Sequence, residues 1–335
     1  MRDGPGDHGE GGRESPRGVD DRRAVSELRR RRRGLVSRRK VFAVLPTLLT
    51  LGNAACGFGA ITYAARVGPD PAEHFLFISA VLIFLAMLFD MLDGSAARLA
   101  RQTSEFGAQL DSLCDGVSFG IAPAFLMLQF LHWMEPASGQ LEEQFQPWFE
   151  YPSRLLWVIA SLFALCALLR LARFNVETDE EDSHTFFSGL PSPAAAATVA
   201  SFPIALMGLR TRADASAGAW QALAHWLIPT TYLVLPAITL CVAVLMVSRF
   251  RYAHFFNQLF RGHRSRLRLI QIILTFAIVF VLREAMPLIF CYFAFTPPVQ
   301  SAWRELTRRG IRRSPAVGEP PRSETGADIE EPTRL

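Results

Sequence analysis

The chain has 335 residues, half of them hydrophobic, and a formal net charge of +4. Its apolar residues come in blocks, and several blocks reach the roughly twenty residues needed to cross a hydrocarbon core of about 30 Å. These properties exclude an ordinary soluble domain and indicate a polytopic, all-α membrane protein.

The chain begins with a polar arm, residues 1–40, which ends in the basic run RRRRRGLVSRRK. An apolar block follows the run directly. We therefore interpret the arm as a basic segment attracted to anionic lipid headgroups, and not as a nucleic-acid contact. Its composition predicts disorder.

Six apolar blocks then predict six transmembrane helices. Their approximate ranges are 41–65, 75–89, 108–131, 155–171, 191–209 and 226–247. Both the length of the first block and the membrane segments after it argue against a cleaved secretory signal.

A further apolar region, 269–295, is interrupted by Arg283, Glu284 and Pro287. It is either one kinked helix or a pair of short helices. We favour the pair, because a polar turn at the membrane face leaves the two charges hydrated. The sequence thus divides into the arm 1–40, a transmembrane catalytic domain 41–298 and a polar tail 299–335, which we expect to be disordered.

Arginine-rich segments predict the orientation. They are the arm and the loops near 98–106, 170–189 and 249–268. The positive-inside rule places all of them in the cytoplasm, together with both termini. The five cysteines stand singly in apolar blocks, which argues against a zinc site or a disulfide framework.

The stretch DMLDGSAARLARQTSEFGAQLDSLCD, residues 90–115, is unusual for its aspartates and glycines. At about 100° per residue, its residues form two helix faces that a short loop can bring together. The first face holds Asp90, Asp93, Gly94 and Ala97, and the second holds Gly107, Asp111 and Asp115.

Four carboxylates gathered at a membrane surface repel one another and lose hydration unless cations are bound. Oxygen ligands without histidine or cysteine favour Mg²⁺ or Mn²⁺, and four aspartates suit two ions. Paired ions of this kind stabilise displacement at phosphorus.

Small residues beside these carboxylates leave room for a nucleotide or diphosphate. Gly94, Ala97 and Gly107 have little or no side chain, so a ligand can approach the backbone closely. Arg98 follows directly and offers a guanidinium for a phosphate. Taken singly, each residue also fits helix packing or the positive-inside rule.

The spacing D-x₂-D-G-x₂-A-R-x₈-G-x₃-D-x₃-D resembles the signature of the CDP-alcohol phosphatidyltransferase family. The resemblance implies a six-helix membrane core that dimerises, a divalent-metal site and cleavage of a CDP-linked lipid with release of CMP. Four stretches resemble the integral-membrane, serine-specific bacterial branch of the family. They are LPTLLTLGNAACGF, LDSLCDGVSFGIAPA, RLARFNV with GLPSPAAA, and LMVSRFRY.

The resemblance also implies residue roles. Asp90, Asp93 and Asp111 would bind metal, and Asp115 would both approach the metals and accept the proton of the acceptor hydroxyl. The CDP-diacylglycerol contacts would be Asp93, Gly94, Ala97, Arg98 and Gly107.

Candidates for the serine carboxylate or the lipid diphosphate are Arg170 and Arg173, although both also fit a topology-setting role. Asn53 and Ser118 are weaker candidates, since a hydroxyl or amide in an apolar helix often serves helix packing.

The implied reaction is phosphatidyl transfer from CDP-diacylglycerol to L-serine in the bacterial cytoplasmic membrane. Two alternatives stay open at this stage. The first is transfer to another alcohol, such as glycerol 3-phosphate, inositol or choline, because the signature does not specify the acceptor. The second is an ion-coupled transporter, with the aspartates along the path of the ion.

Overall fold

The computed structural model describes residues 46–66, 72–100, 105–135, 138, 141–178, 189–215, 218–248, 250 and 283–312. All regular structure within these ranges is helical. The predicted basic arm, residues 1–40, lies outside them, so its predicted disorder stays a prediction.

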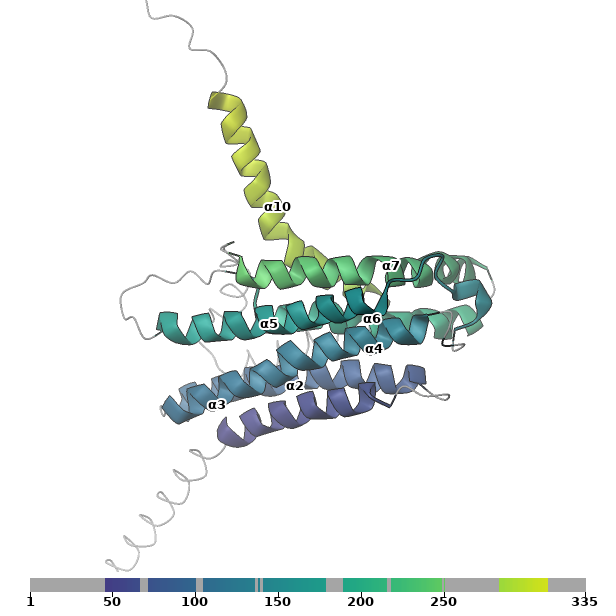
Figure 1. The fold of residues 1–335 in the computed structure, drawn as a ribbon. Helices are drawn as coiled ribbons and strands as arrows, with labels where there is room; N and C mark the ends of the chain where they lie inside the picture. The colour runs from purple at the N-terminus through teal and green to yellow at the C-terminus, as the bar shows by residue number, and fades with distance from the viewer. Residues whose placement is uncertain are drawn as a thin grey trace, which may run out of the picture.

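The main helices run roughly alongside one another in a bundle (Figure 1). The first is a helix over residues 46–64, drawn in the darkest purple. The others are α2 (Ala72–Ala100), α3 (Glu105–Asp115), α4 (Ala122–Met134), α5 (Ser153–Thr178), α6 (Ser192–Ala215) and α7 (Ala219–Val247).

Five segments are long and apolar enough to cross a membrane. They are Ala72–Ser95, Glu105–Met134, Ser153–Val176, Ser192–Ala215 and Ala219–Val247. The second of them joins α3 to α4 through a short π-helix, η1 (Gly116–Ile121). The segments confirm five of the six expected spans. The first expected span, 41–65, is helical over 46–64 and is not among the five.

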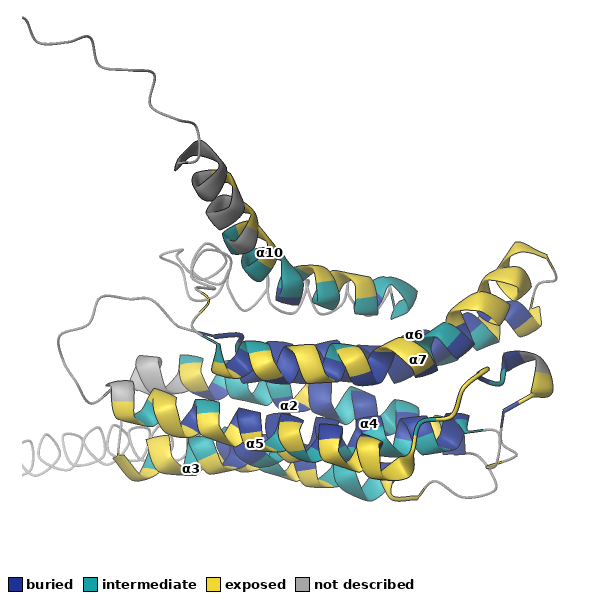
Figure 2. Cartoon of the chain, turned by 45° about the horizontal axis from the view of Figure 1, so that its top comes forward, coloured by how far each residue is buried: buried dark blue, intermediate teal, exposed yellow. Residues whose placement is uncertain are grey.

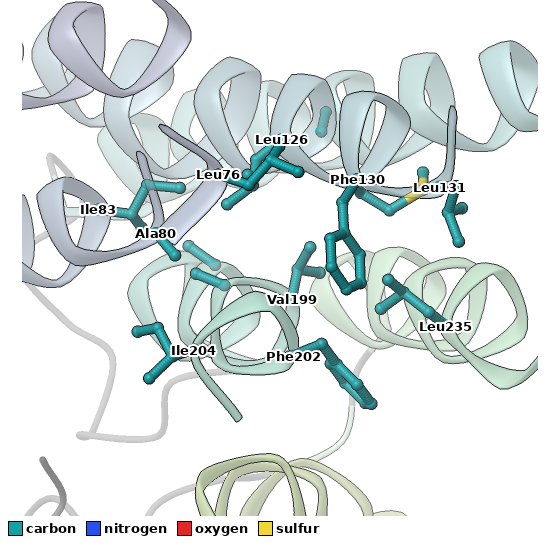
Figure 3. Packing of buried hydrophobic residues seen from close by; sticks show 14 of the residues in the cluster. Leu76, Ala80, Ile83, Leu126, Phe130, Leu131, Val199, Phe202, Ile204 and Leu235 are labelled. Atoms are coloured by element: carbon teal, nitrogen blue, oxygen red, sulfur yellow. The ribbon is translucent and has the colours of Figure 1, made fainter. Parts of the chain in front are cut away.

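Helix α6 is the central helix of the bundle and packs against α2, α4 and α7. Its first half, SPAAAATVAS, consists mainly of small residues, which let neighbouring helices approach closely. Larger apolar side chains fill the space between these helices (Figure 3). Among them are Leu76, Leu126, Phe130, Val199, Phe202 and Leu235.

Apolar side chains also cover much of the outside of the bundle. Figure 2 shows exposed residues along the outer side of α5. Trp157, Leu165 and Leu169 on this helix are each more than half exposed. A surface this apolar suits lipid contact, so the bundle has the character of an integral membrane protein.

Only the second half of the expected C-terminal helical pair lies within the described residues. Residues 269–282 lie outside the described ranges. The chain then forms one 3-10 turn, η4 (Arg283–Ala285), and the helix α10 (Met286–Arg312). Helix α10 bends part-way along (Figure 2), and it contains Pro297 and Pro298. Prolines inside a helix remove hydrogen bonds and kink it.

We expected the disordered tail to begin at residue 299, and helix α10 runs past this position as far as Arg312. The stretch after the prolines contains alanine, leucine, glutamate and arginine, which favour a helix. It also extends an existing helix, so no new nucleation step is needed. The rest of the tail lies outside the described residues.

Candidate active site

Three aspartates come together, two from the C-terminal half of α2 and one from α3. Asp90, Asp93 and Asp111 each offer a carboxylate oxygen, and these oxygens lie within 4.8 Å of one another. One oxygen, Asp111 Oδ1, is buried and has no hydrogen-bond partner among the described residues. Oxygen ligands this close together, one of them unpaired, fit a hard divalent cation.

The helix over residues 46–64 holds two of the carboxylates in place. The hydroxyl of Thr50 donates a hydrogen bond to Asp93 Oδ2 over 3.0 Å. One turn further along, Asn53 Nδ2 donates to Asp115 Oδ1 over 2.8 Å. Thr50, Asn53, Asp93 and Asp115 are all buried, so these bonds are shielded from water.

Asp115 lies one turn beyond Asp111 on the same face of α3. It is not part of the three-aspartate group but is 9% exposed and directly precedes the π-helix η1. π-Helical turns inserted in α-helices frequently occur at functional sites, because they change the direction of the side chains around them. Asp115 thus lies beside the three-aspartate group, at the point where α3 passes into the π-helix.

The π-helix packs tightly against the helix over residues 46–64. A Cβ atom on Gly57 would lie 2.4 Å from Ser118 Oγ and 2.7 Å from Ser118 Cα. Ser118 Oγ donates to the main-chain oxygen of Asn53 over 3.0 Å. This bond is the helix-packing alternative considered for Ser118, and the absence of a side chain at Gly57 permits it.

Arg170 approaches the site from the end of α5. Its guanidinium interacts electrostatically with the carboxylates of Asp115 and Asp90. Arg170 Nη1 donates a hydrogen bond to Ser192 Oγ, at the first residue of α6, over 2.8 Å. The Nε atom is buried and has no hydrogen-bond partner among the residues that the structure describes. A positive group therefore borders the acidic cluster with one donor available.

The remaining predicted residues are placed less completely. Arg173 lies on α5 and is exposed. Gly94 is exposed on α2, and a Cβ atom there would meet no atom of the described residues within 4 Å. Gly107 is half-buried on α3. Ala97 and Arg98 belong to α2, but their side chains lie outside the described part.

Two site residues were not predicted from the sequence, Thr50 and Ser192. Thr50 lies in the same helix as Asn53, one turn earlier, and a polar residue three positions from Asn53 is the signal that points to it. Ser192 belongs to the stretch GLPSPAAA, which resembles the family branch as a whole. The resemblance implied no role for any single residue in it. The contact with Arg170 has no signal in local spacing.

Known proteins similar to this chain point to one family. The family model for CDP-alcohol phosphatidyltransferase matches residues 43–247. A Mycobacterium tuberculosis protein named CDP-diacylglycerol–serine O-phosphatidyltransferase is 30% identical over 202 residues, which cover 58% of this chain and 60% of that protein. A Saccharomyces cerevisiae protein of the same name is 38% identical over 157 residues, covering 45% and 50%.

An archaetidylserine synthase of Methanothermobacter thermautotrophicus is 36% identical over 163 residues, which cover 48% of this chain and 58% of that protein. The matches therefore extend over half to three-fifths of the length of these relatives. The acidic cluster lies inside the range that the family model matches.

Proposed function

This chain belongs to the CDP-alcohol phosphatidyltransferase family, and on that premise we propose that it transfers the phosphatidyl group of CDP-diacylglycerol to the hydroxyl of L-serine, releasing CMP. The observation that carries the proposal is the cluster of Asp90, Asp93 and Asp111 beside Arg170. The names of the relatives support serine as the acceptor.

The three clustered aspartates would hold the metal, which we propose to be two Mg²⁺ or Mn²⁺ ions, with Asp115 near them. Such ions neutralise phosphoryl oxygens and hold them for in-line attack. The protein itself contributes the arrangement of the carboxylates. Because Thr50 bonds to Asp93 Oδ2, that carboxylate is fixed before any ligand arrives.

In the proposed reaction, the serine hydroxyl oxygen forms a bond to the phosphorus of the phosphatidyl group. The bond between that phosphorus and the oxygen of CMP breaks, and the hydroxyl proton passes to Asp115. Asn53 occupies Asp115 Oδ1, which leaves Oδ2 as the oxygen that we assign to the proton. Buried Asn53 also keeps the carboxylate from rotating.

Recognition of the two substrates would divide between the two sides of the cluster. Gly94, Ala97, Arg98 and Gly107 would line the CDP moiety, where the space beside Gly94 supports close approach of a ligand. Arg170 would pair with the serine carboxylate through the donors of its guanidinium, with Arg173 as a second candidate.

The setting is also part of the proposal. We place the protein in the bacterial cytoplasmic membrane, with the acidic cluster and both chain termini in the cytoplasm, because the positive-inside rule assigns the arginine-rich segments of the sequence to that side. A homodimer stays a prediction from the family resemblance.

The test uses the purified full-length chain in detergent with CDP-diacylglycerol, and each candidate alcohol is added in turn with Mg²⁺, Mn²⁺ or excess chelator. We expect CMP and phosphatidylserine only when serine and a divalent ion are both present. CMP release with another alcohol but not with serine would show that this alcohol, and not serine, is the acceptor. Full turnover in excess chelator would rule out the metal.

A further inference from the structure

Two stretches that resemble the family branch, GLPSPAAA and LMVSRFRY, lie far apart in the chain but meet in the fold. The main-chain N–H of Gly189 donates to the carbonyl oxygen of Phe250 over 2.8 Å. The N–H of Leu190 donates to the carbonyl oxygen of Leu245 over 3.1 Å. The segment before α6 is thus fastened to the end of α7.

Gly189 permits this connection by its backbone. Its φ is +90°, a conformation that L side chains rarely adopt, and a Cβ atom there would lie 2.4 Å from the carbonyl oxygen of Met246. The main chain can approach the end of α7 this closely only where no side chain intervenes. The turn therefore has one position relative to α7.

Ser192 stands at the end of this fastened turn, as the first residue of α6. It is 1% exposed, and its Oγ accepts the hydrogen bond from Arg170 Nη1. Pro191, directly before it, has a fixed φ and accepts a hydrogen bond from the N–H of Ala195, so the first turn of α6 is also regular. The backbone that carries Ser192 is thus held on both sides.

This contact matters because an arginine side chain has several rotatable bonds and loses much freedom when it is held in one orientation. The Arg170 guanidinium is attracted to the carboxylates of Asp90 and Asp115, but this attraction alone does not fix its orientation. The directional hydrogen bond from Nη1 to Ser192 fixes it. It leaves the buried Nε, which has no partner among the described residues, available for a ligand.

We infer that Ser192 is a positioning residue for acceptor recognition, which holds the Arg170 guanidinium in the orientation that pairs with the acceptor carboxylate. The inference rests on the proposed function, since it needs an acceptor that carries a carboxylate. It gives a role to GLPSPAAA, which supplies the hydroxyl, and to LMVSRFRY, which anchors the turn. Ser192 itself touches no reacting atom.

The experiment compares Ser192→Ala, Ser192→Thr and wild type in the CMP-release assay, with serine and CDP-diacylglycerol varied separately. Ser201→Ala is the matched control, because Ser201 is a fully buried serine further along α6 whose Oγ donates within its own helix to the oxygen of Thr198. Thermal unfolding of each variant in detergent shows whether it is folded.

We expect Ser192→Ala to raise the apparent Michaelis constant for serine about tenfold, the size of one hydrogen bond to a charged group. The constant for CDP-diacylglycerol should stay within about twofold of wild type on the same scale. Ser192→Thr keeps the hydroxyl and should restore most of the serine affinity. Ser201→Ala should behave as wild type.

An unchanged serine constant in a folded Ser192→Ala protein would overturn the inference and leave the proposed function intact. Three other results would also overturn the inference: a change in the Michaelis constant for CDP-diacylglycerol instead of serine, a serine constant for Ser192→Thr as high as that for Ser192→Ala, or the same defect in Ser201→Ala. A wild-type protein that releases no CMP with serine would overturn the proposed function and the inference together.

Discussion

At the residue scale, Asp93 is the most tightly held carboxylate of the acidic cluster. It is 5% exposed, accepts a hydrogen bond from Thr50 and shares the cluster with Asp90 and Asp111. A buried carboxylate with like charges beside it is costly without a cation. Its charge therefore serves the site and not the stability of the fold.

Asp93→Asn keeps the size of the side chain and removes its charge. We expect the variant to insert and fold but to lose at least about hundredfold in turnover, since even the partners around metal ligands are worth up to that much. CMP release with saturating Mg²⁺ measures the effect. The control is Asp214→Asn, the same change on an exposed residue near the end of α6, which should keep wild-type turnover. Near-normal turnover of Asp93→Asn would show that Asp93 is not part of the site.

Arg170 is the positive residue that the structure places beside the carboxylates of Asp90 and Asp115. Arg170→Lys keeps the charge but loses the planar fork of donors. The apparent Michaelis constant for serine should rise roughly tenfold or more, which corresponds to a loss of about 1.5–3 kcal/mol of binding free energy. The Michaelis constant for CDP-diacylglycerol should change much less. Substrate titrations separate the two. A shift confined to the donor would assign Arg170 to the diphosphate.

At the element scale, the site depends on close contact between the helix over residues 46–64 and the π-helix η1. The first helix carries Thr50 and Asn53, and the π-helix follows Asp115 directly. Gly57 is the point where the two elements have no room for a side chain. Any separation there would also move Asn53 away from Asp115.

Gly57→Ala would place a Cβ atom 2.4 Å from Ser118 Oγ and 2.7 Å from the backbone at Ser118, so the helices must shift apart. We expect a loss of about 1–3 kcal/mol of stability, the usual cost of overpacking, together with reduced turnover. Thermal unfolding in detergent measures the first. Gly59→Ala is the matched control, because its new atom would meet only the end of the Leu82 side chain, at 3.3 Å. Equal stability of the two variants would contradict the close contact.

At the scale of the whole molecule, the two ends of the bundle have different chemistry. The acidic cluster lies toward the end where α2 finishes and α3 begins. At the other end, Arg210 pairs with Glu73 over 2.8 Å and with Glu142 over 3.7 Å, and Arg212 pairs with Glu284 over 2.9 Å. Arginines that would otherwise count toward the cytoplasmic side are thus compensated by acidic partners.

This asymmetry gives a prediction about orientation. Phe106, at the start of α3, and Trp148, in the loop between α4 and α5, are both more than two-thirds exposed and lie at opposite ends of the bundle. In a background without the native cysteines, Trp148→Cys should react with a membrane-impermeant thiol reagent added to intact cells, and Phe106→Cys should react only after the membrane is opened. The reverse pattern would invert the proposed topology.

The sequence by itself determined the class of the protein and pointed to the three clustered aspartates, with Asp115 as a predicted fourth. Long apolar blocks permit few structures other than membrane helices. The three-residue interval between Asp90 and Asp93 puts both on one helix face, and the short connection to α3 brings Asp111 to them. These features follow from local periodicity, which a sequence displays directly.

Only the tertiary structure decided which side chains hold the site in place. Thr50 and Asp93 are separated by 43 residues, Asn53 and Asp115 by 62, and Arg170 and Ser192 by 22. No helical period relates such positions, and a threonine, asparagine or serine in an apolar helix is equally compatible with a bond to its own backbone. The pairings depend on how closely the helices pack, which small residues such as Gly57 and Gly189 permit and which appears only when the whole bundle is assembled.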